Sequence, residues 1–339
     1  MADAPDVTVV VVTYDGAPLL PACLEALAAQ RSRWAWQTWV VDNASRDGTA
    51  ELLRDRYPDV RVLASDRNLG FAGGNNLALR EARSPYVVLL NNDAVVQPGW
   101  LDGLIDVLEA PGHERVAAVT GKVLLADGIR INSAGGLVDT RGYGSDRGWL
   151  EPDDGRYDEP ADVFTASGTA LALRTAALDE VGHFDDDFFL YYEDVDLCWR
   201  LRSRGWSVRY EPRAVVHHAH SATTGGGSEL FHFHDLRNRL LCLGKNASTQ
   251  RWLGEVGRYP LTSLSLVGEA LRERRYADVA RILRRRGRAM ASHLRLLPST
   301  VRKRRAIARA ATVPKAELER WLVPHLATAR SRIAESPLQ

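Results

Sequence analysis

A length of 339 residues allows one large α/β domain with an appendage, or two modest domains. Hydrophobic residues make up 45% of the chain and charged residues 26%, as in an ordinary globular protein with a sizeable core. The formal net charge of +1 excludes a strongly basic chain, so we expect no nucleic acid among its partners.

Cysteine usage and the N-terminus both indicate the cytoplasm. Cys23, Cys198 and Cys242 lie far apart among apolar neighbours, so they can build neither a disulfide framework nor a metal knuckle. The opening segment MADAPDVTVVVVTYDG has no basic region and no apolar run that ends in a cleavage site. No apolar run approaches the roughly 20 residues that span a bilayer. We expect a cytoplasmic protein, either soluble or peripheral on the cytoplasmic face of the membrane.

In the first 120 residues, strand patterns alternate with helix patterns. Apolar, β-branched runs predict strands at 7–12, 38–41, 60–64, 86–90 and 116–120. Helical spacing predicts helices at 19–27, 47–57 and 100–108, and one that ends at Ala82; Ser45 or Asp47 is the expected cap of the second. This alternation predicts an α/β fold, a doubly wound, mostly parallel sheet with helices on both faces and ligands at the carboxyl ends of its strands.

Beyond residue 120 the pattern changes twice. Residues 121–165 contain short strands and Gly/Asp-rich turns, and residues 167–218 return to an apolar segment, a helix near 175–181 and an acidic stretch. From residue 229 the pattern is helical, and residues 272–305 hold 13 basic residues against 2 acidic ones. We expect one domain over 1–228, with halves that meet near residue 120, and a helical, Arg-rich C-terminal extension over 229–339.

A glycine-rich segment, DRNLGFAGGNN at 66–76, joins the third expected strand to a helix. Glycines let a backbone approach a ligand closely, and the free amides of a helix start favour an anion such as a diphosphate. A tight turn between strand and helix, with no ligand, explains the same residues.

The segment VVDNASRDGT at 40–49 places Asp42 and Asn43 at the end of another strand. The carboxylate of Asp42 suits a hydrogen bond from a nucleobase imide or a sugar hydroxyl. Helix capping is the alternative, but Ser45 and Asp47 already fill that role, which favours a ligand for Asp42.

Polar residues also end the strand in YVVLLNNDAVV, residues 86–96. Asn91 and Asp93 offer one neutral and one charged partner to a hard divalent cation, whose other ligands come from phosphates and waters. A strand-end turn is the alternative, because Asn and Asp are common there. Four acids lie at or just beyond the ends of expected strands and are predicted to share one site: Asp15, Asp42, Asp66 and Asp93.

The stretch FFLYYEDVDLCWRLRSRG, residues 188–205, contains the clearest candidate for acid–base chemistry. Leucines one turn apart predict a helix over 194–203, with Glu193, Asp194 and Asp196 at its first turn. Acids there complement the helix dipole, but three of them after an aromatic wall exceed that requirement. A carboxylate kept ionised by the dipole and flanked by apolar surface suits a general base.

The segment AVVHHAHS, residues 214–221, ends a strand with His217, His218 and His220. Three histidines within four residues favour a metal ligand over a structural role. A dedicated zinc site is disfavoured, because only one or two carboxylates accompany them.

The chain resembles the family 2 glycosyltransferases, and in particular their rhamnosyltransferase-like branch, in six motifs that keep their order and spacing over residues 6–245. The motifs are VVTYDG, VVDNASRDGT, NLGFAGGNN, LLNNDAVV, the run from SGTALALR to GHFDDDFFLYYEDVDLCWRL, and the histidine after AVV. The resemblance implies a GT-A fold and an inverting, metal-dependent transfer of a sugar, rhamnose in that branch, from a nucleotide-diphosphate sugar.

The same resemblance implies a site for a divalent cation, Mg²⁺ or Mn²⁺. Asp93 matches the metal ligand of the family's Asp-x-Asp motif. Asn91 departs from the strict motif, which puts in doubt the role of its first residue rather than metal binding. His218 matches the family's metal-binding histidine, with His220 as the reserve choice.

Asp194 matches the family's catalytic base, with Glu193 beside it. Residues 1–120 would then bind the nucleotide sugar, and residues 121–228 would carry the acceptor site and the base. The nucleotide-sugar site implied by the family comprises Thr13, Tyr14, Asp15, Asp42, Asn43, Asp66, Asn68, Gly70, Phe71, Gly73, Gly74, Asn75, Asn91 and Asn92. On the acceptor side we expect Trp149, Ser167, Gly168 and Tyr192.

The favoured donors are dTDP- and UDP-sugars, because a base pocket that fits uracil also fits thymine. The expected acceptor is a hydroxyl of a glycan or of a polyprenyl-linked sugar, in cell-surface polysaccharide synthesis. An anionic membrane surface is a further expected partner, because apolar residues interleave with the C-terminal arginines at Leu283, Met290, Leu294, Leu296 and Leu297. The alternative is a solvated helical pair that packs on the catalytic domain.

Two other functions fit part of the pattern. A sugar-phosphate nucleotidyltransferase also binds a nucleotide and a metal, but it carries a Gly/Arg-rich loop after its first strand, where this chain has TYDGAPLL. A non-catalytic nucleotide-sugar-binding scaffold would need no Asp93, Asp194 or His218, and all three are present.

Overall fold

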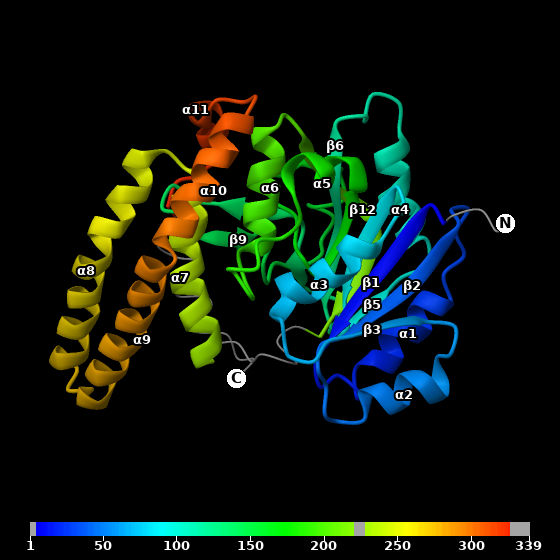
Figure 1. Cartoon of the computed structure of the whole chain (residues 1–339), viewed down its shortest axis with the longest axis horizontal. Helices are drawn as coiled ribbons and strands as arrows, with labels where there is room; N and C mark the ends of the chain where they lie inside the picture. Colours follow the sequence, from blue (N-terminus) through cyan, green and yellow to red (C-terminus); the bar gives the residue numbers. More distant parts are fainter. Residues whose placement is uncertain (1–4, 220–227, 326–339) are drawn as a thin grey trace.

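The computed structural model describes residues 5–219 and 228–325. A sheet lies between two layers of helices, and further helices form one end of the molecule (Figure 1). The main sheet has the strand order β10-β12-β6-β11-β4-β1-β2-β3, with β5 paired to β12 and β7 to β6. Strands β4, β1, β2 and β3 are parallel, whereas β11 runs antiparallel to both β4 and β6. The predicted α/β fold, with a mostly parallel sheet and helices on both faces, is confirmed.

The strands are β1 (Val7–Thr13), β2 (Trp36–Asp42), β3 (Arg61–Ala64), β4 (Tyr86–Asn91), β5 (Ala94–Val96), β6 (Val116–Leu125), β7 (Ile131–Ser133), β8 (Gly136–Val138), β9 (Gly144–Asp146), β10 (Ala161–Asp162), β11 (Ala170–Arg174) and β12 (Ser207–His218). The helices are α1 (Leu20–Ala28), α2 (Thr49–Arg56), α3 (Gly70–Glu81), α4 (Trp100–Glu109), α5 (Thr175–Val181), α6 (Glu193–Ser203), α7 (Glu229–Asn246), α8 (Thr249–Arg272), α9 (Tyr276–Arg295), α10 (Leu297–Ala310), α11 (Lys315–Leu318) and the 3-10 helix η1 (Glu319–Trp321). The elements expected in the first 120 residues are all present.

Two of these elements differ in detail from the prediction. Strand β6 continues past Thr120 to Leu125, because its last residues are buried and pair with β12 and β7. At the start of α2, Asp47 accepts the backbone N–H of Thr49 at 3.2 Å, whereas Ser45 accepts the backbone N–H of Asp15. The N-cap of α2 is Gly48, with a φ of 91°, so the prediction of Ser45 or Asp47 as the cap is wrong, although Asp47 does accept an N–H at the start of the helix.

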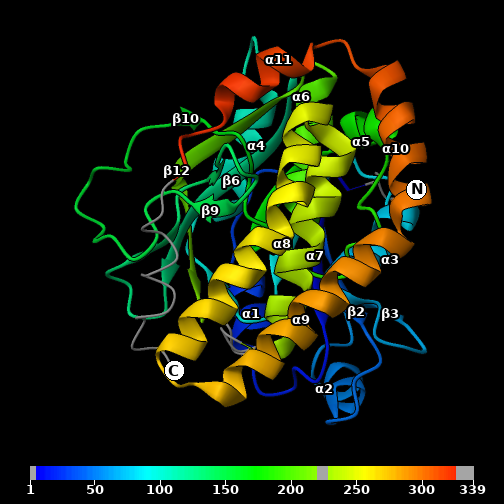
Figure 2. The same cartoon turned by 90° about the vertical axis from the view of Figure 1, so that its left-hand side faces the viewer.

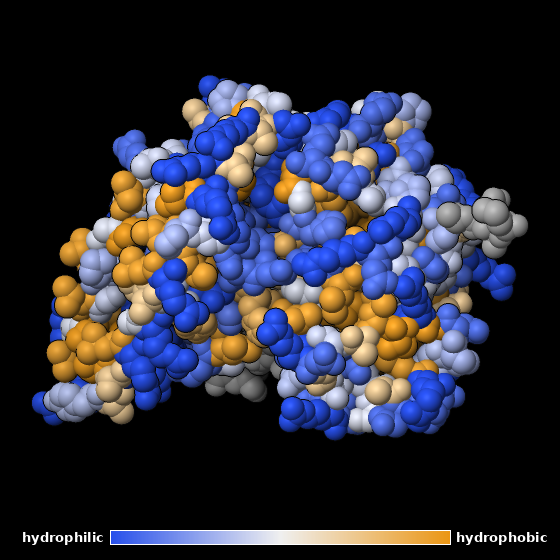
Figure 3. All heavy atoms as spheres, in the orientation of Figure 1, coloured by the Kyte–Doolittle hydropathy of each residue, from blue (hydrophilic) through white to orange (hydrophobic). Residues whose placement is uncertain are grey.

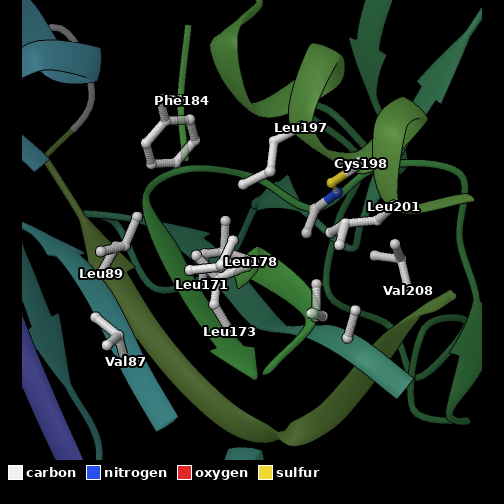
Figure 4. Close-up of a cluster of buried hydrophobic side chains, with 14 of the residues drawn as sticks. Val87, Leu89, Leu171, Leu173, Leu178, Phe184, Leu197, Cys198, Leu201 and Val208 are labelled. Carbon is white, nitrogen blue, oxygen red and sulfur yellow. Dashed lines mark hydrogen bonds between the residues drawn. The ribbon is translucent and has the colours of Figure 1, made fainter. Parts of the chain in front are cut away.

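Alternating side chains along the buried strands build two cores. Val9 of β1 faces a core formed with α1, α2 and α4, whereas the neighbouring Val10 faces a core formed with α3, α5 and α6. Figure 4 shows the second core, where Leu197 and Leu201 of α6 lie over Leu171 of β11. This packing fixes α6 relative to the sheet.

An irregularity in β12 sets the position of its last residues. The pairing of β12 with β6 shifts between Glu211 and Val215, after which residues 215–218 pair with 122–125. Within this shift, the carbonyl oxygen of Ala214 stands where a Cβ on Gly121 would lie. The absence of a side chain at Gly121 therefore permits the close approach that brings His218 to the end of the strand.

Helices α7 to α10 pack beside the α/β core. Helix α7 contacts α6, and α8, α9 and α10 contact α7. Helices α8 and α9 form a hairpin whose outer side faces the viewer in Figure 2. The domain boundary near residue 228 stays a prediction, although α7, which begins directly after it, packs on the helix that carries Asp194.

Replacing Gly121 by Ala should lower the free energy of unfolding by about 1–3 kcal/mol, because the new methyl group meets a backbone oxygen. Gly254 of α8 provides the control, since no heavy atom lies within 4 Å of its Cβ position. There the same substitution should stabilise the chain, by up to about 1 kcal/mol. Chemical denaturation measures both variants, and equal stabilities would contradict this account of β12.

Candidate active site

Asp93 and His218 meet where β5 begins and β12 ends. The two strands pair antiparallel, with Ala94 opposite His218. Asp93 Oδ1 lies 3.1 Å from His218 Nε2, and Asn91 Nδ2 lies 3.3 Å from the same nitrogen. The side chains of Asp93 and His218 are only 6% and 8% exposed. The residues that the sequence proposed for the metal therefore lie together.

Asn132 of β7 fixes the orientation of His218. Its Oδ1 atom lies 2.6 Å from His218 Nδ1. An amide oxygen only accepts hydrogen bonds, so Nδ1 carries a proton, and Nε2 is the ring nitrogen that faces Asp93. Metal-binding histidines are commonly held in this way by a hydrogen bond to their second nitrogen.

The donor set at this point fits a hard divalent cation. An imidazole lone pair and a carboxylate oxygen at 3.1 Å repel each other unless a proton or a cation lies close to both. Within residues 5–219 and 228–325, no three His, Cys, Asp or Glu side chains gather as a metal site. One carboxylate and one imidazole suit Mg²⁺ or Mn²⁺ that shares a diphosphate, rather than a structural zinc.

The two other histidines of the segment are not at this point. His217 lies on the opposite side of β12, where its ring approaches the Cβ position of Gly128. His220, the reserve choice for the metal, lies outside the described residues.

Asp194 lies in the first turn of α6 and is bonded to the segment before β11. Its Oδ2 accepts the N–H of Gly168 at 3.1 Å, and its Oδ1 accepts the N–H of Val195 at 2.7 Å. The carbonyl of Thr169, the residue after Gly168, accepts the N–H of Asn91 at 2.9 Å. Burial raises the pKa of Asp194 although these N–H groups oppose the rise. A raised pKa brings this carboxylate closer to the range in which a general base works at neutral pH.

The three acids at the start of α6 have different environments. Asp196 is fully buried, and although burial opposes it, Lys245 and Arg200 lower its pKa through contacts of 2.8 Å each. Glu193 is 5% exposed, and its Oε2 accepts no hydrogen bond from the described residues. Burial and the neighbouring Asp194 raise the pKa of Glu193 well above its ordinary value. Glu193 therefore holds its proton to higher pH than an ordinary glutamate, which favours Asp194 as the base.

Asn43 holds together the loops on the donor side. It is 2% exposed, and its Nδ2 donates to Asn68 Oδ1 and to the Gly70 carbonyl, both at 3.1 Å. Its Oδ1 accepts the N–H of Leu69 at 2.8 Å. Both amide protons are used within the protein, so Asn43 supports the 66–70 segment, and its predicted contact with a nucleotide sugar stays a prediction.

The remaining acids of the predicted site lie around this loop cluster. Asp42, 6% exposed, accepts the N–H of Ser45 at 3.0 Å. Asp15 has a φ of +48° and accepts a backbone N–H from the 43–48 loop at 2.7 Å. Asp66 is exposed just after β3, and Tyr14 is 38% exposed after β1. These residues border the carboxyl ends of β1, β2 and β3, as the sequence predicted.

The glycines of α3 serve close packing. Gly70, with a φ of +69°, has the carbonyl and the ring of Phe189 at its Cβ position. Gly73 and Gly74 are buried, and a Cβ on Gly74 would lie 2.7 Å from Val12. Asn75 donates its side-chain amide within the helix, to the Phe71 carbonyl. Their role near a diphosphate stays a prediction, and only Gly70 of the three glycines stands at the helix start.

Thr13 and Asn92 bind each other beneath the site. Asn92 Nδ2 donates to Thr13 Oγ1 at 2.9 Å, and the residues are 7% and 1% exposed. A Cβ on Gly16 would overlap both side chains. The pair therefore fixes the turn after β1, and its role in binding a nucleotide stays a prediction.

Gly168 lies between the donor side and the base. A side chain there would lie 2.9 Å from the Phe71 ring and 3.6 Å from Asp194 Oδ2. The neighbouring Ser167 hydroxyl donates to Thr169 Oγ1 at 3.2 Å. The segment before β11 thus brings the start of α3 and the start of α6 together.

Sequence reasoning missed Asp146 of β9 and Asn132. Burial raises the pKa of Asp146 to about 6, and Asp194 and His218 both act on its charge. The Trp149 N–H donates to the Asp146 carbonyl at 3.4 Å, so this predicted acceptor residue borders β9. Tyr192 borders it too, since its hydroxyl accepts the N–H of Gly144. Strands of three residues in a Gly/Asp-rich region give no periodic signal that could have indicated these positions.

Comparison with known proteins identifies the family. The sequence matches glycosyl transferase family 2 over residues 8–142 and glycosyl transferase family group 2 over residues 86–311. It is 33% identical over 250 residues to the N-acetylglucosaminyl-diphospho-decaprenol L-rhamnosyltransferase of Mycobacterium tuberculosis (strain ATCC 25618 / H37Rv), an alignment that covers 67% of this chain and 80% of that protein. The chain belongs to the family 2 glycosyltransferases.

Solved structures share the fold. GalNAc-T7, solved with UDP, GalNAc and Mn²⁺, superposes with a TM-score of 0.57 at 16% identity over 72% of this chain and 48% of that one. The mannosyltransferase PcManGT from Pyrobaculum calidifontis, solved with GDP-Man and Mn²⁺, gives 0.50 at 20% identity over 99% and 83%. The predicted GT-A fold and enzyme class are confirmed, and the chain is an inverting glycosyltransferase.

The protonated state of Glu193 makes stability depend on pH. In the unfolded chain Glu193 ionises at its ordinary pKa, whereas the folded chain keeps it protonated to higher pH, so its contribution to stability falls as the pH rises above the ordinary range. Glu193→Gln should remove this loss, so its gain in unfolding free energy should grow as the pH rises from 5 to 8. Denaturation at several pH values tests this, with the exposed Glu51→Gln as control. A gain that does not change with pH would contradict it.

Proposed function

We propose that the chain transfers a sugar from a nucleotide-diphosphate sugar to a hydroxyl of a lipid-linked acceptor in cell-surface polysaccharide synthesis, and that the reaction requires a divalent cation. One observation supports this most directly. Contacts run without a break from Asp93 and His218, through Asn91 and residues 168–169, to Asp194. A cation site and a base at the two ends of this short path suit a sugar that lies between them.

In the proposed reaction, Asp194 accepts the proton of the acceptor hydroxyl as that oxygen attacks the anomeric carbon. The attack comes from the face opposite the diphosphate, and the bond from the anomeric carbon to the diphosphate oxygen breaks in the same displacement. Its electron pair leaves with the nucleoside diphosphate, and the configuration inverts. Asp93 and His218 would hold the cation, whose positive charge stabilises the departing diphosphate.

For the donor we propose a dTDP- or UDP-sugar, with rhamnose as the transferred sugar. The activity named for the mycobacterial relative supports rhamnose and a polyprenyl-linked acceptor. Asp42, at the end of β2, is the proposed partner of the nucleobase imide. The two solved relatives were determined with Mn²⁺, one together with UDP and the other with GDP-Man, which supports a divalent cation without deciding between Mg²⁺ and Mn²⁺.

Transfer to a short-chain polyprenyl-diphosphate N-acetylglucosamine tests the proposal, with dTDP-, UDP- and GDP-sugars, each with Mn²⁺, Mg²⁺ or EDTA. We expect turnover from one donor that EDTA abolishes. Asp194→Asn should lower kcat by about 10²–10⁴-fold, because general-base catalysis is lost. The control is Asp179→Asn, an exposed acid on α5, which should keep full activity.

Each assignment can fail separately. Full turnover by Asp194→Asn would remove Asp194 as the base. Turnover that persists in EDTA would remove the cation, and with it the proposed roles of Asp93 and His218. If the chain neither binds nor turns over any of these donors, the proposed function itself is wrong.

The α8–α9 hairpin carries the surface that we propose for an anionic membrane. Figure 3 shows hydrophobic residues gathered on the left of the molecule, over α8 and α9. The exposed leucines lie at helical spacing and are Leu253, Leu261, Leu264 and Leu271 of α8 and Leu283 and Leu294 of α9, each 47–65% exposed. Arg284, Arg288 and Arg295 are exposed beside the leucines of α9. Leucines together with arginines suit the boundary of a bilayer that contains anionic lipids.

The apolar part of this surface lies mainly on α8, which the sequence did not indicate. Of the interleaved residues expected to contact lipid, Met290, Leu296 and Leu297 are partly buried against neighbouring helices. Among the described residues, no helix is long and apolar enough to cross a bilayer. Contact with a membrane would therefore run along the surface of the hairpin.

Flotation with vesicles tests this surface. The chain should float with vesicles that contain about 30% phosphatidylglycerol, less with phosphatidylcholine alone, and less at high salt, because screening weakens the arginine term. Leu261→Asp/Leu264→Asp should lose flotation, whereas the control Val62→Asp/Ile129→Asp, which changes exposed apolar residues elsewhere, should keep it. If the unmodified chain does not float, the proposal is overturned. If the unmodified chain is a dimer in solution and Leu261→Asp/Leu264→Asp makes it a monomer, the leucines instead bind a second copy of the chain.

A further inference from the structure

The loop that precedes Asp194 has an unusual backbone. Phe189, Tyr191 and Tyr192 have φ angles of 66°, 67° and 72°, in the left-handed region that residues other than glycine rarely adopt. Three such residues within four positions keep this conformation only where their surroundings determine it. Because α6 begins at Glu193, this loop decides where Asp194 lies.

A single buried amide of α7 contacts most of the loop. Asn238 is 0% exposed, and its Nδ2 lies 2.9 Å from the carbonyl oxygen of Phe188, 2.8 Å from that of Leu190 and 2.7 Å from that of Tyr191. The loop belongs to no helix or strand, and of these three carbonyls that of Phe188 also accepts the N–H of Leu190, at 2.8 Å. Asn238 thus supplies the hydrogen bonds that regular structure would otherwise provide.

Arg237 sets the orientation of Asn238. Its Nε donates to Asn238 Oδ1 at 2.8 Å, so the Nδ2 end of the amide must face the loop. Its Nη2 donates to the carbonyl oxygens of Asp187 and Phe188 at 2.7 and 2.8 Å. Two consecutive residues of α7 therefore contact four carbonyls among residues 187–191.

The other side of the loop contacts the donor half of the site. The Phe189 carbonyl accepts the N–H of Ala72 at 3.2 Å, and Gly70 packs against the same residue. The Phe189 ring stacks on His234 of α7, with centroids 5.3 Å apart. The loop is therefore fixed between α7 and the start of α3.

We infer that Arg237 and Asn238 are positioning residues of the transfer reaction, which hold the 187–192 loop, with its three left-handed residues, in the conformation that sets Asp194 against Gly168. The inference rests on the proposed function in one respect, the role of Asp194 as base. It makes α7 part of the catalytic machinery, although the helix lies beyond residue 228 and neither residue touches substrate.

Asn238→Ala and Asn238→Asp test the inference in the full chain. Alanine removes the amide whose two N–H groups serve the three carbonyls, and aspartate turns a carboxylate oxygen toward the same three carbonyl oxygens. In the transfer assay described above, both should lower kcat about 100-fold, the loss expected when a reacting group moves by about 1 Å, and change the donor KM less than about threefold. The matched control is Leu240→Ala, which empties a fully buried position of α7 that packs with Tyr259 and Ala289 away from the loop.

Hydrogen exchange supplies a measurement that needs no activity. In both Asn238 variants, amides 188–196 should exchange at least tenfold faster than in the unmodified chain, whereas Leu240→Ala, even with an equal loss of Tm, should leave them protected. Unchanged exchange in this segment would overturn the inference. So would a kcat that falls only as far in the Asn238 variants as in Leu240→Ala. If Asp194→Asn retains activity while loop exchange still rises, the role of the base fails and the loop contacts stand.

Discussion

The hydrogen bonds of residues 168 and 169 join the two halves of the active site. Gly168 donates to Asp194 at the start of α6, and Thr169 accepts from Asn91 at the end of β4. Strand β11 can make both contacts because it enters the sheet antiparallel, between β4 and β6, at the edge where the parallel strands end. A larger residue than glycine at 168 would separate the Phe71 ring from Asp194. The distance between the metal side and the base therefore depends on a single turn of backbone.

The acids around this turn are kept from repelling one another by different means. Asp196 and Asp185 face the Lys245 ammonium at 2.8 and 2.6 Å, so both remain ionised within the protein although burial opposes it. Glu193 has no such partner among the described residues, and burial together with the neighbouring Asp194 raises its pKa. Protonation of Glu193 removes one negative charge beside Asp194 in the first turn of α6.

The sequence predicted those parts of the site that lie directly after strands, because parallel strands end at one edge and polar residues there break an apolar run. Asp93 and Asp42 follow this rule, whereas Asp194 was indicated by the acids at the start of a helix and by the family motif. It could not separate the residues that touch a ligand from the residues that hold them, and Asn43, Asn92 and Thr13 are buried supports. Nor could it find Asn132 or Asn238, whose partners are 86 and about 50 residues away in the chain. A lone asparagine carries no periodic signal, and only tertiary contact assigns its amide.

The C-terminal helices work under two opposite constraints, which explains their composition. The side of α7 that faces the catalytic core is polar although it is buried. Arg237, Asn238 and Lys245 are 8%, 0% and 3% exposed. The first two donate hydrogen bonds to the 187–191 loop, and Lys245 binds Asp196 of α6. The outer side of α8 is apolar although it is exposed, from Leu253 to Leu271. Burying each such leucine would contribute about 1.5–3 kcal/mol, and the fold forgoes that contribution. An isolated helical bundle would be destabilised both by a buried polar face and by an exposed apolar face. Both faces have a role if the helices contact the 187–192 loop before Asp194 on one side and a lipid surface on the other.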